Sequence, residues 1–309
     1  MEKLTITDEA FDSMECLQGN IDRYNYYFAS AIKLQNHLIN YSIDNTSRRF
    51  HSNITNMPGS LRQFLRINNE PLINIDIKNS QPYLSVIILT NPSKVSWLTE
   101  NTAFAMLLQT LKVSLNEDVR KYISLVVTGQ IYEYLMEEFF KEGIPLTRSE
   151  TKRQVLRILF ARNRKPKDET NRKCRQIFKD RFPTVHKIFS KVRGHEKGDK
   201  FQNFKRFAIL LQRIESYLML DVILKRIYRE LPGVIAITIH DSIMTGILTN
   251  KAQAVKKIMA EEFTFFCGAT PKIKIEKYNK ELRIIKGERK EEIRAISNHY
   301  DATTFVSAN

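Results

Sequence analysis

Short apolar runs, some ending at an aspartate, are the feature that most limits what this chain can fold into. Leu72 to Ile77 (LINIDI) is short and β-branched, which predicts a buried strand. Residues 234–240 (VIAITIH) and 243–248 (IMTGIL) predict two strands with a tight turn between them, and residues 271–278 (PKIKIEKY) alternate as a half-buried strand. A long helical pattern separates the first strand from the others. The chain therefore belongs to the α+β class, with a small sheet interrupted by a helical block.

The remaining segments have helical or turn-like patterns. Helices are expected at residues 20–41, 82–142 (with breaks at Asn91-Pro92 and near Asn116), 147–161, 175–192, 203–230 and 251–265. Thr147 is a candidate N-cap of its helix. Polar or turn-rich segments are expected at residues 46–58, 163–174 and at Pro232-Gly233, and the charged tail from about residue 287 has no assigned structure.

Composition narrows the class of partner. The chain has 309 residues and is 42% hydrophobic, so it can bury a sizeable core and global disorder is excluded. Its net charge of +15, from 49 Lys and Arg against 34 Asp and Glu, is typical of a polyanion-binding protein, although a soluble basic protein has the same balance. Three scattered cysteines, no signal-like N-terminus and no long apolar run predict a cytoplasmic protein that does not enter a membrane.

Asp76 and Asp241 are the candidate catalytic carboxylates. Asp76 ends a predicted strand and Asp241 lies in the turn of a predicted hairpin. Each has an ordinary explanation when taken alone, since Asp76 could cap the next helix and Asp is common in turns. Together they match the need of nucleotidyl transfer for two divalent ions about 3.5–4 Å apart. Mg²⁺ prefers one or two carboxylates with phosphate oxygens and water.

The helix predicted at residues 147–161 carries the candidate phosphate-binding cations. Arg148 and Lys152 are four residues apart, so both project from one face, and Phe160 lies two turns further along on a neighbouring face. Cations that face the two aspartates would neutralise a triphosphate and stabilise charge on the leaving group. The alternative is a basic helix face that only contacts solvent.

Three motifs in this order resemble those of a polymerase superfamily. IDIKNSQPYL resembles motif A, Arg148-x-x-x-Lys152 with Phe160-Ala161 resembles motif B, and IHDSIMTG resembles motif C of the single-subunit phage-type RNA polymerases and family-A DNA polymerases. TSRRFHSNITNMPGSLRQFL, FKDRFPTVHKIF, LQRIESYLML and PKIKIEKY are similar to further segments of these families, in the same order. The resemblance covers about residues 46–280.

The resemblance implies a right-hand polymerase palm, built on a small antiparallel sheet, with a large helical fingers insertion and a reduced thumb. It places N-terminal helices or a reduced thumb at 1–45, the palm at 46–90 and 200–285, the fingers at 91–199 and a tail at 286–309. Asp76, Asp241 and Lys152 are the implied catalytic residues, and two Mg²⁺ ions (Mn²⁺ is an alternative) are held by Asp76, Asp241 and Ile77. The implied substrate-binding residues are Arg148, Phe160, Gln81, Arg49 (with Arg48 as an alternative), Gln212 and His240.

Departures from the families bear on the sugar. Gln81 stands five residues after Asp76, where family-A DNA polymerases have a Glu that blocks the ribose 2′-OH and RNA polymerases have Gly. Phe160 replaces a Tyr that both families usually carry. Both changes favour deoxynucleotides. Against this, a glutamine amide could also hydrogen-bond a 2′-OH, and the residues of motifs B and C are closer to those of the RNA polymerases.

Three functions follow from these features. The leading one is a compact DNA polymerase, possible in a phage or mobile element, that uses a nucleic-acid template, a primer and nucleoside triphosphates. The alternatives are a compact RNA polymerase or primase, and a catalytically inactive, polymerase-derived nucleic-acid-binding protein. The retained carboxylates argue against the last. About 45 residues precede the first motif, so we expect no proofreading, low processivity, and a protein partner or existing primer.

Overall fold

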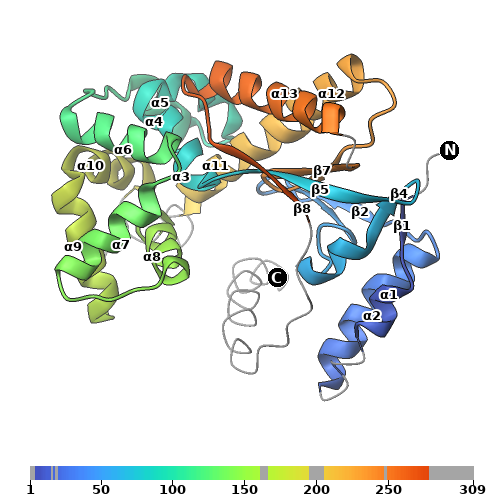
Figure 1. Ribbon diagram of the computed structural model, residues 1–309. Helices are drawn as coiled ribbons and strands as arrows, with labels where there is room; N and C mark the ends of the chain where they lie inside the picture. Colours follow the sequence, from blue (N-terminus) through green and yellow to red (C-terminus); the bar gives the residue numbers. More distant parts are fainter. Residues whose placement is uncertain are drawn as a thin grey trace, which may run out of the picture.

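The fold is that of a computed structural model, which describes residues 4–14, 17, 20–160, 166–194, 205–246 and 249–277. It is a mixed structure of helices around an antiparallel sheet (Figure 1), which confirms the predicted α+β class. The predicted tail at 286–309 lies outside the described residues. In the part of the chain that the structure describes, no helix is both long and apolar enough to cross a membrane.

The strand β5 (Glu70–Ile77) is the centre of the sheet. The order is β1 (Leu4–Ile6), β4 (Leu65–Ile67), β5, β7 (Ser242–Gly246), β6 (Ile237–Ile239), and β8 (Ile273–Lys277) also pairs with β5. All of these pairings are antiparallel. The strands predicted at 72–77, 234–240, 243–248 and 271–278 are therefore confirmed for their described residues, although β6 is shorter than expected. β1 and β4 have no counterpart in the prediction.

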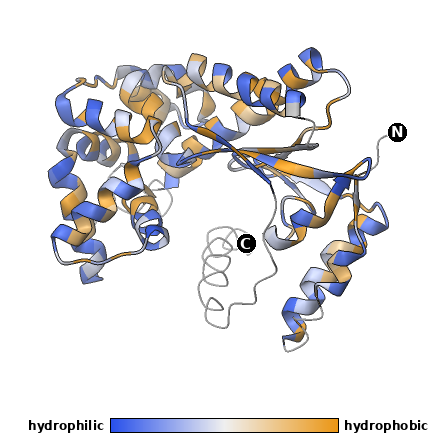
Figure 2. Ribbon diagram, in the orientation of Figure 1, coloured by the Kyte–Doolittle hydropathy of each residue, from blue (hydrophilic) through white to orange (hydrophobic). Residues whose placement is uncertain are grey.

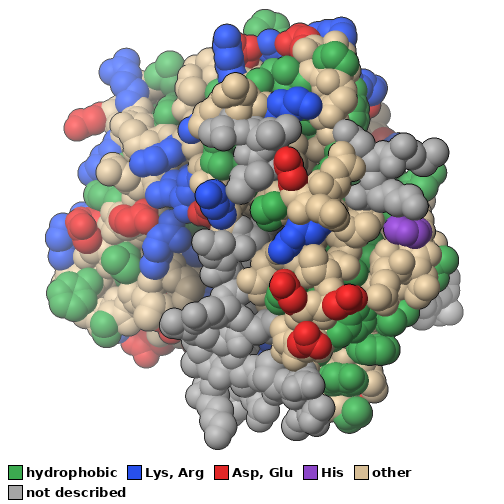
Figure 3. All heavy atoms as spheres, turned by 45° about the vertical axis from the view of Figure 1, so that its right-hand side comes forward, with side chains coloured by type: hydrophobic (Ala, Val, Ile, Leu, Met, Phe, Trp, Pro, Cys, Tyr) green, Lys and Arg blue, Asp and Glu red, His purple; other side chains and the backbone are tan. Residues whose placement is uncertain are grey.

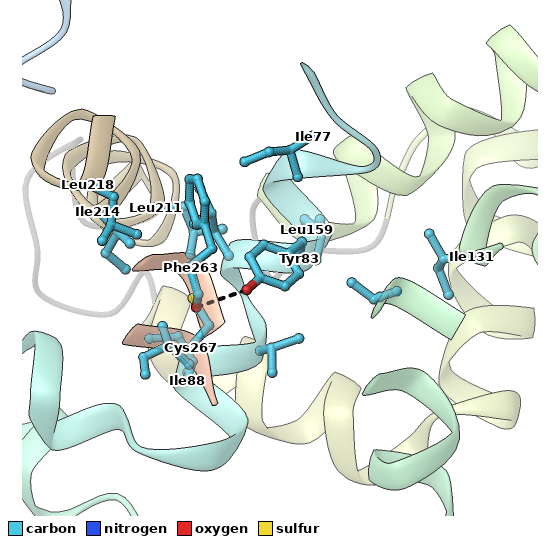
Figure 4. Close-up of a cluster of buried hydrophobic side chains, with 14 of the residues drawn as sticks. Ile77, Tyr83, Ile88, Ile131, Leu159, Leu211, Ile214, Leu218, Phe263 and Cys267 are labelled. Atoms are coloured by element: carbon cyan, nitrogen blue, oxygen red, sulfur yellow. Dashed lines mark hydrogen bonds between the residues drawn. The ribbon is translucent and has the colours of Figure 1, made fainter. Parts of the chain in front are cut away.

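One face of β5 holds the main hydrophobic core. Ile73, Ile75 and Ile77 alternate along the strand and are each 3% exposed or less. They share one buried core with side chains of α3 (Ser80–Leu84), α11 (Arg206–Ser216) and α13 (Thr249–Cys267). Figure 4 shows this core, in which the Tyr83 hydroxyl donates to the Phe263 carbonyl oxygen over 3.1 Å. The opposite face of β5 carries Asn74 and Asp76.

A block of helices follows β5 directly. Its members are α3 (Ser80–Leu84), α4 (Val86–Thr90), the 3₁₀ segment η3 (Pro92–Leu98), α5 (Thr102–Thr110), α6 (Glu117–Val127), α7 (Ile131–Lys141), α8 (Arg148–Phe160), α9 (Glu169–Arg181) and α10 (Pro183–Arg193). In Figure 2 these helices carry both hydrophobic and hydrophilic residues, as expected for helices that bury one face. The breaks predicted at Asn91-Pro92 and near Asn116 are confirmed, since η3 begins at Pro92 and α6 follows Asn116.

After the block, the chain returns to the sheet through one long helical segment. α11 continues into a π-helical segment, η5 (Tyr217–Ile223), and α12 (Leu224–Glu230), which confirms the helical pattern expected at 203–230 for its described part. Gly233 has φ +76°, a left-handed conformation that favours glycine because it has no Cβ atom, and it lies in the turn predicted at Pro232-Gly233.

A second, smaller core lies under the other end of the sheet. α1 (Glu9–Asp12), α2 (Ile21–Gln35) and the 3₁₀ segment η2 (Gly59–Phe64) pack there with β1 and β4, around Leu72 and Met244 (Figure 1). The C-terminal boundary predicted for the helix at 20–41 is wrong, because α2 ends at Gln35. The chain leaves the helix after Gln35, His37 has φ +55°, and β2 (Tyr41–Ile43) pairs instead with β3 (Phe50–Ser52).

The middle of the chain differs from its prediction as well. Residues 163–174 are predicted as a polar or turn-rich segment, and the described residues 166–173 are indeed half-buried or exposed. The difference is that α9 begins at Glu169 and buries Cys174, and the Asp168 side chain caps it by accepting from the Asn171 N–H over 2.7 Å. The helix expected at 175–192 is two helices, because Pro183 has no N–H to continue α9 and begins α10 instead. Cys174 and Cys267 are buried free thiols, and Cys16 lies outside the described residues.

Candidate active site

Strand pairing brings Asp76 and Asp241 together although they are 165 residues apart in the sequence. Asp76 lies directly opposite Ser242 in the β5–β7 ladder, and Asp241 immediately precedes Ser242. His240 and Asp241 form the two-residue turn between β6 and β7, and His240 has φ +52°, as the first position of such a tight turn requires. Paired residues in an antiparallel ladder have Cα atoms about 4.5–5.5 Å apart. Asp76 is that close to Ser242, and Asp241 is the residue next to Ser242 in the chain, so the two aspartates lie at the same end of the neighbouring strands β5 and β7.

The two carboxylates influence each other's proton affinity. Burial, followed by the negative charges of Asp241 and Glu276, raises the pKa of Asp76 to about 7. Burial also raises the pKa of Asp241, against the lowering effects of a hydrogen bond from Ser80 and of the charges of Lys152 and Arg49. A pair of carboxylates that repel each other in a partly buried site is stabilised by a cation. The arrangement is therefore suited to binding a positive charge.

Lys152 supplies a positive charge next to both aspartates. Its charge lowers the pKa of Asp76 and of Asp241, and its side chain is exposed, so the ammonium group is near the pair without being enclosed. The helix that carries it, α8, packs on α3 and α11. Thr147 caps α8 as predicted: the Glu150 N–H donates to Thr147 Oγ1 over 3.3 Å, and the Thr147 N–H donates to Glu150 Oε2 over 2.8 Å.

Arg148 is bound to neighbouring residues of the helical block. Its Nε donates to Glu133 Oε1 over 2.7 Å, and its guanidinium lies 5.5 Å from the centre of the Tyr132 ring. Tyr132 is itself near the site, because the charge of Asp241 contributes to raising its pKa. The side chain of Arg148 is still half exposed, so it can exchange Glu133 for a substrate phosphate.

Glu215 on α11 is the residue of this site that the sequence did not reveal. It is 2% exposed, and its carboxylate accepts from Arg49 Nε over 2.9 Å and from Gln81 Nε2 over 2.6 Å. Arg49 Nη2 lies 2.7 Å from the same Oε1, and Ser80 Oγ is 3.5 Å from Oε2. Burial raises the pKa of Glu215 to about 7, although Arg49 opposes that change. LQRIESYLML reads as an ordinary amphipathic helix, so nothing in the pattern marked Glu215.

The remaining candidate residues surround this centre at different distances. His240 lines a small cavity together with Arg49, Glu215 and Thr238, and its ring meets that of His51 edge to face, with 6.1 Å between the centroids. Gln212 is half-buried on α11, one turn before Glu215. Phe160 packs at the end of α8 against Phe207, with 6.4 Å between ring centroids, and no described contact joins it to Gln81.

The ordinary explanation for Asp76 does not fit the structure. The N-cap position of α3 is Asn79, which adopts φ +56° and makes no side-chain capping bond. Asp76 therefore does not cap that helix. The side chain of Lys274, directly opposite Asp76 in β8, and the charge of Glu276 are further features of the site that the sequence gave no reason to select.

Unpaired buried polar atoms are found on the segment that leads from β5 into α3. Within the described residues, Asn74 Oδ1, both polar side-chain atoms of Asn79, and Gln81 Oε1 have no hydrogen-bond partner. Thr151 Oγ1, next to Lys152 on α8, is in the same state. Buried polar groups normally have partners, so these atoms have bonding capacity that water, an ion or a ligand could satisfy.

The metal-binding capacity of the site is limited to a few donors. Among the described residues, no group of three or more His, Cys, Asp or Glu side chains is arranged as a metal site. Two neighbouring carboxylates nevertheless fit Mg²⁺, which commonly takes one or two carboxylates and completes its octahedron with water and substrate phosphates. The donor chemistry therefore suits a metal that arrives together with a nucleotide better than a resident structural ion.

Comparison with known proteins gives little independent information. No protein-family model matches the chain, and no curated protein matches it. One solved structure that matches the chain is the POL domain of Pol1 from M. smegmatis in complex with DNA primer-template and dNTP, with a TM-score of 0.43 and 10% identity. The match covers 84% of this chain and 51% of that one, so the chain spans about half of its length. At that similarity, we base the functional proposal on the residues of the site.

Proposed function

We propose that this chain is a compact family-A-like DNA polymerase core that performs template-directed nucleotidyl transfer with two Mg²⁺ ions. The observation that carries the proposal is the meeting of Asp76 and Asp241 on neighbouring strands, with the charge of Lys152 acting on both. A protein that only binds nucleic acid has no need of two carboxylates that repel each other at the same end of neighbouring strands. Their repulsion lowers the stability of the fold, and a catalytic role would explain why both are present.

In this proposal Asp76 and Asp241, with the backbone of Ile77, hold the metal ions. Ions held there would supply a Lewis acid for the primer 3′-oxygen and positive charge for the leaving pyrophosphate. Lys152 places its positive charge beside the triphosphate, and Arg148 joins it after release from Glu133. Gln81 lies beside the sugar, with Phe160 on the other side. Gln212 lies near the primer end, Arg49 contacts primer–template or the incoming nucleotide, and His240 is a further substrate-binding residue.

The proposed division of the chain follows the fold. The sheet and the helices behind it, residues 46–90 and 200–285, form the palm, and the helical block at 91–199 forms the fingers. Residues 1–45 are the reduced thumb or N-terminal helices, with β1 joined to β4 of the sheet. We expect the face between these parts to bind template and primer. On the face drawn in Figure 3, Lys and Arg side chains lie mainly over the left-hand and upper parts, with some Asp and Glu among them. Such positive charge fits a polyanionic partner.

RNA synthesis is the second candidate, and one observation favours it. Gln81 Oε1 is a buried acceptor with no partner among the described residues, and a ribose 2′-OH is a donor that could satisfy it. The bulk of Gln81, in contrast, favours a deoxyribose. The two candidates therefore differ in a measurable quantity, the preference between dATP and ATP.

Primer extension on a defined DNA template tests the proposal. We expect the protein to add dATP to a primer in the presence of Mg²⁺, and D76N and D241N each to abolish addition while primer–template binding stays within a few fold. D221N is the matched control, because Asp221 lies on η5 in an exposed ion pair with Lys225. A preference for ATP over dATP would favour RNA synthesis over DNA synthesis as the function of the chain. Normal addition by D76N would contradict the assignment of the site.

A further inference from the structure

Glu215 is a buried carboxylate that joins two parts of the proposed nucleotide site. Both of its oxygens accept from donors: Arg49 binds Oε1 and Gln81 binds Oε2, with Ser80 Oγ at 3.5 Å from the same Oε2. Arg49 belongs to the segment before β3, whereas Ser80 and Gln81 begin α3. Burying a charge in this way rarely adds stability compared with well-packed apolar residues. Its retention at 2% exposure points to a role in the site.

The contact between Glu215 and Gln81 fixes the orientation of the Gln81 amide. An ionised carboxylate only accepts hydrogen bonds, so the amide group of Gln81 must turn its NH₂ towards Glu215. The 2.6 Å separation between Nε2 and Oε2 agrees with a charge-assisted bond. The amide oxygen of Gln81 then faces away from Glu215, and it is the atom that has no partner among the described residues.

A metal-binding role for Glu215 is less consistent with these contacts. Its carboxylate is engaged by Arg49, Gln81 and Ser80, and the described residues hold no group of three acidic or other metal-ligating side chains arranged as a metal site. A carboxylate that binds a guanidinium and an amide on its two oxygens is occupied in holding side chains. Glu215 is therefore better placed to position Gln81 and Arg49 than to ligate an ion.

We propose that Glu215 is a positioning residue that sets sugar selectivity by holding Gln81 in one orientation. This inference rests on the proposed nucleotidyl transfer at Asp76 and Asp241. A Gln81 side chain that is fixed presents both a defined volume and a defined acceptor to the sugar. A Gln81 side chain that rotates freely presents neither, so the enzyme loses part of its discrimination whichever sugar it prefers.

The experiment measures the ratio of kcat/KM for ATP to that for dATP in single-nucleotide addition. We expect E215A to move this ratio towards one by about tenfold, the effect of one lost hydrogen bond of ordinary strength. E215Q keeps the side-chain volume but puts an NH₂ group where the carboxylate can accept a hydrogen bond. Two NH₂ groups cannot bond each other, so the present orientation of the Gln81 amide is no longer favoured and we expect the ratio to change as well. Its near-native shape keeps the test valid if E215A does not fold.

Two controls separate positioning from a general structural effect. In a Q81A background, E215Q should leave the ratio where Q81A alone puts it, because the side chain to be held is absent. E138A is the matched control, since Glu138 is also buried, at 6% exposed, and bonds Lys141 and Arg181 on the helical block. It should reduce thermal stability and leave the sugar ratio unchanged.

The outcomes distinguish this inference from the proposed function. If the wild type adds neither nucleotide, the proposed function fails before Glu215 is tested. If the wild type is active and E215Q slows both nucleotides equally, or changes the ratio as much in the Q81A background, Glu215 has only a structural role and the inference is wrong. A ratio change that depends on Gln81 supports it.

Discussion

Asp76 shows most clearly that this site is arranged at the expense of stability. Its carboxyl has a pKa of about 7 in the folded chain, against 3.8 as the ordinary value, because burial and the charge of Asp241 disfavour ionisation. Between those two values the folded state binds a proton that the unfolded state has released. The contribution of Asp76 to the stability of the metal-free protein should therefore fall as pH rises from about 4 to about 7, and stay low above.

The first prediction concerns D76N in the presence of a chelator. The amide cannot ionise, so D76N should be more stable than the wild type at pH 8, by a few kcal/mol at most, because each pKa unit corresponds to about 1.4 kcal/mol. The difference should shrink as pH falls towards 4. Urea unfolding at several pH values measures it. A D76N protein that is less stable than the wild type at pH 8 would show that Asp76 has a favourable structural role.

The second prediction concerns Mg²⁺. A metal ion binds the ionised carboxylates and competes with protons for them, so more Mg²⁺ should be required for half-maximal activity at pH 6 than at pH 8. Saturating Mg²⁺ should raise the thermal stability of the wild type at pH 8 and change that of D76N much less. Equal Mg²⁺ requirements at the two pH values would contradict the raised pKa of Asp76.

The third prediction concerns Lys152. If its charge acts on the triphosphate, K152A should slow nucleotide addition by roughly 10²–10³, with little change in primer–template affinity. K173A is a suitable control, since Lys173 is an exposed cation on α9 paired with Glu169. Rapid single-turnover addition separates the chemical step from binding. Normal turnover with weakened template binding would reassign α8 to contacts with the nucleic-acid backbone.

At the scale of elements, α8 is positioned by its first turn. Thr147 and Glu150 exchange hydrogen bonds across the N-terminus of the helix, which satisfies N–H groups that have no partner inside it. The fourth prediction is that T147A lowers the free energy of unfolding by about 1 kcal/mol. T110A, which removes a hydroxyl near the end of α5, should cost less than about 0.5 kcal/mol. Equal losses in the two variants would mean that the cap does not hold α8.

Prediction from sequence succeeded for elements whose apolar residues recur at a regular spacing. It failed for elements that form only by pairing with a segment elsewhere in the chain. α11 to α12 and β5 to β8 have clear apolar patterns, and all of them are found near the expected positions. The helix predicted at 20–41 instead runs on to Tyr41, which together with Ser42 and Ile43 forms a strand because Phe50 to Ser52 pairs with them. The short β1 likewise exists through its pairing with β4.

The same distinction applies to the site. Asp76, Asp241 and Lys152 could be selected because each stands at a recognisable position of a strand, a turn or a helix. Glu215 could not, and neither could Arg193, a fully buried residue outside the site that donates to the carbonyl oxygens of Ile158 and Leu159 at the end of α8. A charged residue on a helix normally indicates a solvent-facing side, and only the packing of other segments around it shows that it is buried.

For the whole molecule, the decisive quantity is the charge of +15. If that charge serves binding to a nucleic-acid backbone, each phosphate contact releases counterions, and the logarithm of the binding constant should fall linearly with the logarithm of the salt concentration. Several contacts give a slope of several units and a loss of roughly 10²-fold or more between 50 and 200 mM salt. The fifth prediction is such a slope for primer–template binding, measured by fluorescence anisotropy.

A charge reversal at one exposed cation refines this test. Arg48 is exposed and lies beside Arg49 at the site, at 3.9 Å from Glu100. R48E should weaken binding at low salt and reduce the slope by about one to two units, because contacts with phosphate are lost. K257E, at an exposed position of α13 next to Glu261, should change the slope less. A flat salt dependence in the wild type would mean that the positive charge keeps the protein in solution and that the template is held by other contacts.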